Sequence, residues 1–265
     1  MRTPDPLDVG RRLRVSGNGT AGTVLMLHAL GLDGRAFDPL RDALDSRWRI
    51  VSLDLPGHGV AASHVDFTLD ECVQQTLRTL DCCCSEPIHL VGHSMGGAIA
   101  ALAAAQAGAA RIASLAVVAS PPRGAPVFAA RGDTAIAPGI EAVIPTTLAR
   151  WFGSDGSAGD GRAFAYARAA LGEMRTAGFS SAWRALASFG GYESLAARLP
   201  RTLAIAGDRD LSTPPPVMQE IVGAFAQAGH GDRIRLRTVR GSGHMLVLEA
   251  ANEVAALLDA HWTEV

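Results

Sequence analysis

Short runs of consecutive apolar residues recur along the chain, separated by longer segments that carry apolar residues at helical spacing. A continuous apolar run is typical of a strand that is buried on both faces of a parallel sheet. The runs that predict such strands are residues 23–28, 49–53, 88–91, 113–118 and 202–206. A sixth run, residues 234–239, alternates apolar and polar positions and predicts a strand at or near the edge of the sheet.

The segments between these runs carry helix-start signals. Asp38 precedes Pro39, an order that indicates an N-cap followed by proline at the first helical position. Thr68 and Glu71 form the pattern of a capping box and predict a helix with Leu69 and the following apolar residues on one face. Strands that alternate with helices predict an α/β fold, with a mainly parallel, doubly wound sheet.

Residues 121–200 interrupt this alternation with glycine- and proline-rich turns and two predicted helices. We interpret residues 121–200 as a helical cap (lid) inserted over one end of the sheet, and residues 154–161 as a mobile loop within it. Residues 1–120 and 201–265 then form the core domain.

Composition narrows the class of protein. Of 265 residues, 48% are hydrophobic and 19% are charged, which suits one large domain with a substantial core. The net charge of −2 gives no reason to expect nucleic acid as a partner. No signal-peptide order opens the chain, and the small-residue stretch 98–110 is far short of the ~20 apolar residues of a membrane span, so we expect a cytoplasmic protein. The four cysteines lack zinc-site spacing, and we expect them to be reduced and no metal to be bound.

The strongest chemical signal is Gly92-His93-Ser94-Met95-Gly96. It follows the predicted strand 88–91 and precedes a helix of small residues, which is the context that a G-x-S-x-G nucleophile turn requires. The sharp turn exposes the serine, and the helix start supplies unpaired amides. We therefore predict that Ser94 is a nucleophile; the alternative is an ordinary turn serine.

A serine nucleophile needs a base, and the base needs an acid to fix its tautomer. His244 lies in a loop after the strand 234–239, at the carboxyl end where sites in parallel sheets form. Asp208 and Asp210 both follow the strand 202–206, and Asp210 is favoured because it lies further into the loop. Serine, then acid, then histidine is the chain order found with the G-x-S-x-G nucleophile turn, and Ser94, Asp210 and His244 follow it.

Two backbone amides should stabilise the oxyanion. We assign one to Met95, directly after the nucleophile, and the other to Leu30, in the loop after the first buried strand, with a shift of one residue as the alternative. Asp54 and His58, in Asp54-Leu55-Pro56-Gly57-His58-Gly59, are interpreted as structural, bonding the backbone of a tight turn.

These motifs resemble the α/β-hydrolase superfamily over nearly the whole chain. The matching pieces are Leu27-His28-Ala29-Leu30-Gly31, residues 54–59, Gly92-His93-Ser94-Met95-Gly96-Gly97, Gly207-Asp208-Arg209-Asp210 and Gly243-His244. The chain has His28-Ala29 where the family has His-Gly, and its short N-terminal region indicates that one edge strand is reduced or absent. Within the superfamily it looks most like the 3-oxoadipate enol-lactonase group and related carboxylesterases.

The resemblance implies a cofactor-independent hydrolase acting on a small-molecule ester or lactone. Alternatives are C–C bond cleavage, elimination or cyclisation by the same triad, or a ligand receptor on the same fold. The cap should determine specificity, and Trp151, Phe152 and Trp183 are candidates for substrate binding, with packing between the cap and the core domain as the other interpretation. An enol-lactone substrate would also require a carboxylate-binding arginine; the candidates in the cap are Arg123, Arg131, Arg150, Arg168 and Arg175.

Overall fold

Seven strands form one twisted sheet in the computed structural model, which describes residues 10–83, 86–153 and 161–264. The order across the sheet is β1-β3-β2-β4-β5-β6-β7. The strands are β1 (Leu13–Ser16), β2 (Gly22–Leu27), β3 (Trp48–Leu53), β4 (Ile88–His93), β5 (Ile112–Val118), β6 (Thr202–Gly207) and β7 (Ile234–Val239). All neighbours run parallel except β1, a short antiparallel strand beside β3. The six predicted strands are confirmed, β7 at the edge included.

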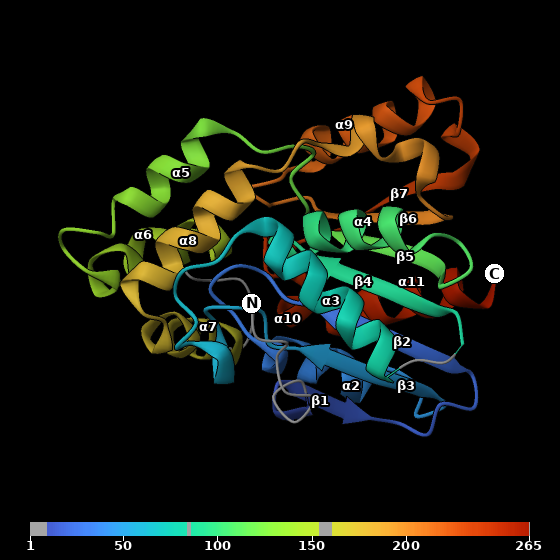
Figure 1. Ribbon diagram of the computed structural model, residues 1–265, viewed down its shortest axis with the longest axis horizontal. Helices are drawn as coiled ribbons and strands as arrows, with labels where there is room; N and C mark the ends of the chain where they lie inside the picture. Colours follow the sequence, from blue (N-terminus) through green and yellow to red (C-terminus); the bar gives the residue numbers. More distant parts are fainter. Residues whose placement is uncertain (1–9, 84–85, 154–160, 265) are drawn as a thin grey trace.

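Helices cover both faces of the sheet, as the alternation predicts (Figure 1). Leu25 and Leu27 of β2 share one core cluster with α3 (Leu69–Cys83), α4 (Met95–Ala107) and α9 (Pro215–Gln227). Val24 and Met26 point to the other face and share a cluster with α2 (Asp38–Ala43), α10 (Leu246–Glu249) and α11 (Ala251–Thr263). This alternation along β2 is what a strand buried on both faces requires.

Four α-helices lie in the described part of the chain between β5 and β6, where the sequence predicts two helices. They are α5 (Pro126–Asp133), α6 (Ile140–Phe152), α7 (Arg162–Glu173) and α8 (Thr176–Ala187). Pro126 stands in the first turn of α5 and Pro145 lies inside α6, so residues that normally signal breaks fall within helices. Figure 1 shows the four helices at the end of the sheet toward which the arrowheads of β3 and β4 point. We call these four helices the cap.

Two predictions about the cap stay predictions. The predicted mobile loop, residues 154–161, falls outside the described residues except for Gly161, which is the N-cap of α7. The division into a core domain and a cap domain also stays a prediction. Within the described part of the chain, no helix has both the length and the apolarity needed to cross a membrane.

Of the two predicted helix starts, the one at Thr68 is confirmed, and the one at Asp38 differs from the structure by one residue. At α3, the Thr68 hydroxyl accepts the N–H of Glu71 (3.2 Å), and the Glu71 carboxylate accepts the N–H of Thr68 (2.7 Å), so the capping box is confirmed. Asp38 is the first residue of α2 rather than its N-cap. The short helix η1 (Gly34–Phe37) runs directly into α2 and makes Phe37 the preceding residue.

Replacement of Thr68 by alanine removes the hydroxyl that caps α3. We expect the free energy of unfolding of Thr68→Ala to fall by about 1 kcal/mol, the usual cost of losing such a cap. Chemical denaturation of the wild type and the variant measures this difference. A variant as stable as the wild type would show that the capping box contributes nothing to α3.

Candidate active site

Ser94 lies at the turn between β4 and α4 and has an unusual backbone conformation. Its φ is 53° and its ψ is −114°, a region that residues other than glycine rarely adopt. The Ser94 N–H donates to the carbonyl of Val118 (2.8 Å), and the Ser94 carbonyl accepts the N–H of Gly97 (2.9 Å). The side chain is 9% exposed and faces the cap. The turn therefore has the geometry that the G-x-S-x-G motif predicts.

Glycine is required on both sides of this turn. A Cβ on Gly92 would lie 2.2 Å from the carbonyl oxygen of Gly96, and a Cβ on Gly96 would lie 2.1 Å from that of Leu27. Such contacts leave no room for any side chain. The spacing of the two glycines in the motif thus follows from the close crossing of β4, α4 and β2.

His244 and Asp210 complete a hydrogen-bonded chain with Ser94. The Ser94 hydroxyl lies 3.0 Å from Nε2 of His244, and Nδ1 of His244 lies 2.8 Å from Oδ2 of Asp210. His244 and Asp210 are each only 3% exposed. The structure thus brings together the three residues that the sequence selects, from three separate loops at the carboxyl ends of β4, β6 and β7.

Asp210 is held as an acceptor by its own loop. The backbone N–H groups of Ser212 (2.6 Å) and Thr213 (3.0 Å) donate to Oδ1, and the Thr213 hydroxyl donates to Oδ2 (2.8 Å). Burial by itself raises the pKa of Asp210, but the charge of His244 and these hydrogen bonds outweigh it and hold the pKa well below its usual range. A carboxylate in this position fixes Nδ1 of His244 as the protonated nitrogen.

Asp208, the competing acid, has another role. Its carboxylate accepts the N–H of Gly241 (2.7 Å) at the start of the loop that carries His244. It therefore braces that loop from the exposed side and does not reach the imidazole.

The backbone of His244 is fixed from two sides. Its N–H donates to the carbonyl of Trp151 at the end of α6 (3.0 Å), and its carbonyl accepts a hydrogen bond from Nε2 of His93 (2.8 Å). Burial, together with the charge of His244, lowers the pKa of His93 to about 3, so His93 stays neutral. The cap and the residue next to Ser94 thus both position the His244 loop.

The two predicted oxyanion donors have free amides. Neither the N–H of Leu30 nor that of Met95 is hydrogen-bonded to another residue within the described ranges. The N–H of Gly31, a possible one-residue shift, is instead donated to Nε2 of His58 (3.1 Å). Met95 is the first residue of α4, where the helix dipole favours negative charge.

The motif around Asp54 and His58 braces this oxyanion loop, as the structural interpretation predicts. Asp54 accepts the N–H groups of Gly34 (2.8 Å) and Val60 (3.0 Å). His58 Nδ1 donates to the carbonyl of Pro56 (2.8 Å), which leaves Nε2 as the acceptor for Gly31. Burial and then the charge of nearby His28 lower the pKa of His58 to about 3. The neutral ring can therefore keep both hydrogen bonds.

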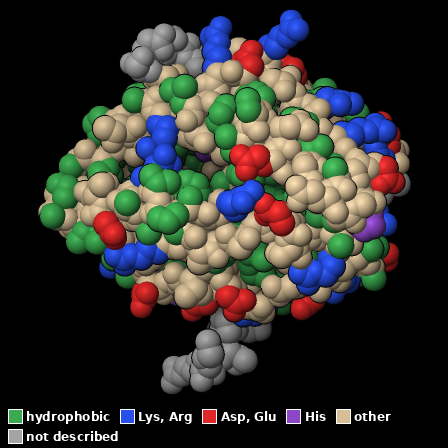
Figure 2. Space-filling model, turned by 90° about the horizontal axis from the view of Figure 1, so that it is seen from above, with side chains coloured by type: hydrophobic (Ala, Val, Ile, Leu, Met, Phe, Trp, Pro, Cys, Tyr) green, Lys and Arg blue, Asp and Glu red, His purple; other side chains and the backbone are tan. Residues whose placement is uncertain are grey.

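A small cavity of about 30 Å³ lies between Ser94 and the cap. Its lining residues are Leu30, Ser94, Pro121, Phe128, Arg131, Trp151, Trp183, Leu186, Ser212, Thr213 and His244. This volume holds only one or two water molecules, so an organic substrate requires the cap helices to move. Figure 2 shows a hollow in the face seen from above, with hydrophobic and basic side chains at its rim.

The cavity includes two of the three predicted substrate-binding residues. Trp151 and Trp183 belong to its lining. Phe152 does not: its buried ring packs against Phe164 of α7, with centroids 5.6 Å apart. Arg131 is the arginine among the lining residues of this cavity. The sequence pattern alone does not distinguish it from the other four candidate arginines of the cap.

Arg131 and Arg150 face the same indole ring. Their Cζ atoms lie 5.3 Å and 5.6 Å from the centroid of Trp183. Burial lowers the pKa of both, and the charge of Arg131 adds to the effect on Arg150, whose pKa falls to about 10. Neither arginine forms an ion pair with any acid among the described residues. Two positive charges therefore lie beside the cavity without a counter-charge.

No group of three or more histidine, cysteine, aspartate or glutamate side chains in the described ranges is arranged to hold a metal ion. The free cysteines there are Cys72, Cys82 and Cys83.

Comparison with known proteins places these features in context. A model of the alpha/beta hydrolase family matches residues 24–257. The 3-oxoadipate enol-lactonase 1 of Acinetobacter baylyi is 31% identical over 225 residues, covering 82% of this chain and 81% of that protein. A pimeloyl-acyl-carrier-protein methyl ester esterase of Methylococcus capsulatus is 32% identical over 147 residues, covering 56% and 52%. The solved structure of the enol-lactonase from Burkholderia xenovorans has a TM-score of 0.82 at 25% identity, covering 96% of this chain and 98% of that one. The resemblance inferred from the motifs is confirmed.

The neutral buried histidines predict acid sensitivity. His58 and His93 have pKa values of about 3 in the folded chain, below the 6.5 of an unfolded histidine. The unfolded chain therefore binds more protons below pH 6.5, and stability present at neutral pH is lost as the pH falls. At pH 5, each of these two histidines should lower the free energy of unfolding by roughly 2 kcal/mol relative to neutral pH.

Thermal unfolding between pH 7 and pH 4.5 measures this loss. His89→Gln provides a test outside the site, because burial lowers the pKa of His89 to about 4 and its ring lies away from Ser94, hydrogen-bonded to Ser114 through Nδ1 and packed against Trp48 and Trp262. We expect the stability of His89→Gln to fall less steeply with acid than that of the wild type. Parallel curves would contradict the prediction.

Proposed function

This chain belongs to the alpha/beta hydrolase family, and we propose that it is a serine hydrolase that cleaves a carboxylic ester or lactone of a small molecule. The observation that carries the proposal is the hydrogen-bonded chain from Ser94 through His244 to Asp210, with distances of 3.0 Å and 2.8 Å. A buried carboxylate, an oriented imidazole and a serine hydroxyl within hydrogen-bond reach of that imidazole are the groups that nucleophilic acyl transfer requires.

In the first half-reaction, Oγ of Ser94 attacks the carbonyl carbon while Nε2 of His244 takes its proton. The amides of Leu30 and Met95 receive the negative charge that forms on the carbonyl oxygen. The C–O bond to the leaving group then breaks, and His244 gives its proton to the departing oxygen. In a lactone that oxygen stays attached to the acyl group.

In the second half-reaction, water attacks the acyl carbon and His244 takes a proton from it. The bond to Oγ of Ser94 breaks, and His244 returns the proton to the serine. Asp210 stabilises the imidazolium that forms in both halves. Every proton is carried by this chain and by water. The names of the relatives, an enol-lactonase and a methyl ester esterase, support an ester or lactone as the substrate class.

The unpaired arginines beside the cavity support a narrower substrate class. Arg131 lines the cavity that contains Ser94, and Arg150 lies on the same Trp183 ring. A substrate with a second, free carboxylate would supply the missing negative charge, and a guanidinium binds a carboxylate through two parallel hydrogen bonds. We therefore propose an ester or lactone that carries a carboxylate away from the reacting carbonyl.

Replacement of Ser94 by alanine tests the nucleophile. We expect kcat/KM for a 4-nitrophenyl ester to fall by a factor on the order of 10³ or more, as for other serine triads. Ser212→Ala is the matched control, because its hydroxyl lies in the same cavity without a partner in the described chain while its backbone N–H holds Asp210. The control should keep most of the activity. Full activity in Ser94→Ala would refute the mechanism.

Replacement of Arg131 by glutamine tests the carboxylate class. The 4-nitrophenyl esters of pentanoic acid and of glutaric acid differ only in a methyl group against a carboxylate. For Arg131→Gln we expect KM for the glutarate ester to rise about 10- to 100-fold, the value of a charge-assisted pair, while KM for the pentanoate ester changes little.

Arg184→Gln is the control for this experiment. Arg184 is an exposed arginine of α8 that already pairs with Asp133 (2.8 Å). It should leave both KM values unchanged. Equal changes for the two esters in Arg131→Gln would show that Arg131 shapes the cavity without reading a carboxylate.

A further inference from the structure

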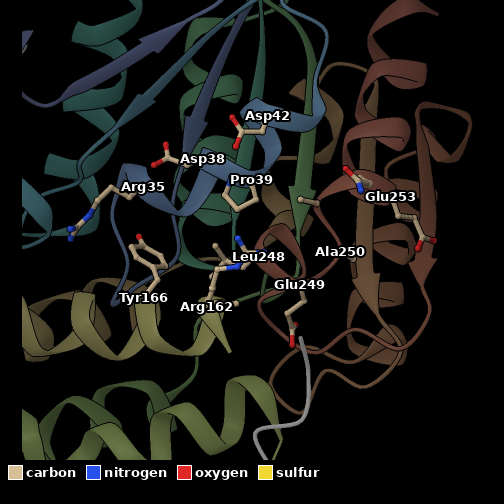
Figure 3. A pocket seen from close by; sticks show the side chains of 13 residues that line it. Arg35, Asp38, Pro39, Asp42, Arg162, Tyr166, Leu248, Glu249, Ala250 and Glu253 are labelled. Atoms are coloured by element: carbon tan, nitrogen blue, oxygen red, sulfur yellow. The ribbon is translucent and has the colours of Figure 1, made fainter. Parts of the chain in front are cut away.

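A second, larger cleft is lined by residues other than those of the cavity at Ser94 (Figure 3). Its volume is about 860 Å³, and it is bordered by η1, α2, α7, α10 and α11. Glu249, at the end of α10, is one of its lining residues. The proposed mechanism does not use this side chain, yet its carboxylate reaches the backbone of the loop that carries His244.

Consecutive residues of this loop are each held through a hydrogen bond to their backbone. The N–H of Gly241 is donated to Asp208, the carbonyl of Ser242 accepts the N–H of Arg209 (3.0 Å), and the N–H of His244 is donated to Trp151. The N–H of Gly243 is donated to Oε2 of Glu249 (3.1 Å). Glu249 thus supplies the anchor of the residue directly before His244.

The surroundings of Glu249 disfavour its charged form. Its Oε1 is buried and has no hydrogen-bond partner in the described part of the chain. Burial raises the pKa of Glu249 to about 7; the hydrogen bond from Gly243 lowers it, and the negative charge of Asp210 raises it further. The carboxylate and the neutral acid therefore coexist at physiological pH.

We infer that Glu249 is a positioning residue whose carboxylate form holds the Gly243 N–H, and through it the His244 loop, more firmly than its neutral form does. A hydrogen bond to a charged acceptor is roughly twice as strong as one to a neutral acceptor. The inference rests on the proposed function, since it makes ester hydrolysis depend on the charge of Glu249.

Asp210, in the loop after β6, is the charged group whose field raises the pKa of Glu249. The other charged and titratable residues that line the same cleft are Arg35 of η1, Asp38 and Asp42 of α2, Arg162 and Tyr166 of α7, and Glu253 of α11. A side-chain oxygen of Glu249 accepts the N–H of Gly243, and the backbone of Met245 also lowers the pKa of Glu249, so the two residues that flank His244 receive the direct effect of its charge.

Three variants separate charge, hydrogen bonding and general cleft electrostatics. Glu249→Gln keeps an oxygen that accepts the Gly243 N–H but cannot ionise. Glu249→Leu removes the acceptor as well. Glu253→Gln is the matched control, because Glu253 is an exposed acid of the same cleft without a contact to the loop.

The first readout is the pH profile of kcat/KM between pH 5 and pH 9. We expect Glu249→Gln to lose about fivefold at pH 8.5, the loss of roughly 1 kcal/mol of hydrogen-bond strength. Its acid limb should fit one ionisation where the wild type requires two. Glu249→Leu should lose more, and Glu253→Gln should match the wild type. Profiles of Glu249→Gln and wild type that superimpose would overturn the inference, as would an equal change in Glu253→Gln.

The second readout needs no substrate. A folded pKa of about 7 exceeds the usual 4.5, so the folded chain binds more protons between these values and loses stability as the pH rises through them. The melting temperature of the wild type relative to Glu249→Gln should therefore fall by a few degrees from pH 5 to pH 8. A constant difference would show that Glu249 does not change its charge in this range and would overturn the inference.

Inert wild-type protein in the ester assay would refute the proposed function separately. The rate at which a fluorophosphonate labels Ser94 then replaces hydrolysis, because labelling requires only the activated serine. Faster labelling of the wild type than of Glu249→Gln above pH 7 would support the positioning role. Equal rates, or no labelling of either protein, would overturn it.

Discussion

The strained turn at Ser94 is the constraint on which the rest of the site depends. A positive φ at a residue with a side chain costs on the order of 1–3 kcal/mol and persists only where the surroundings enforce it. Here the enforcement is specific: β5 accepts the Ser94 N–H through Val118, and the crossing of β4, α4 and β2 is so close that Gly92 and Gly96 have no room for a Cβ. The sheet core therefore fixes where Ser94, the proposed nucleophile, lies, and the loops that carry Asp210 and His244 must reach it there.

The His244 loop is held near Ser94 by hydrogen bonds to its backbone, and one of these bonds, to Trp151, connects it to the cap. The Trp151 carbonyl accepts the N–H of His244, while its ring lies so close to the oxyanion loop that a Cβ on Gly31 would come within 2.7 Å of it. Trp151 also lines the small cavity over Ser94. Trp151 thus connects α6 of the cap both to the His244 loop and to the loop that carries Leu30. Leu171 of α7 adds a second contact to the latter loop, since the same Cβ on Gly31 would lie 2.7 Å from its Cδ2.

The sequence predicts what depends on local pattern and fails where distant segments meet. Buried strands, the capping box at Thr68 and the serine turn all follow from short-range spacing, and chain order places the acid and the base at the same sheet edge. The doubled number of cap helices does not follow, since prolines within α5 and α6 imitate breaks. The roles proposed for Arg131 and Glu249 depend on contacts between distant segments, which residue spacing cannot predict. Arg131 lines the cavity at Ser94, and Glu249 accepts a hydrogen bond from the His244 loop. A lone acid after the apolar run 245–248 was the available signal for Glu249.

Charge is distributed unevenly around the site, and this distribution bears on its chemistry. Burial lowers the pKa values of His28, His58 and His93, three histidines near Ser94 and His244, so they act as uncharged hydrogen-bonding groups. Asp210 supplies a negative charge on one side of His244, while Arg131 and Arg150 place positive charge across the cavity. A low-dielectric, closed cavity strengthens both fields. In the proposed mechanism, the positive side would favour an anionic substrate in the ground state, and the negative side would favour the imidazolium that forms only during the reaction, so the two fields would serve binding and catalysis separately.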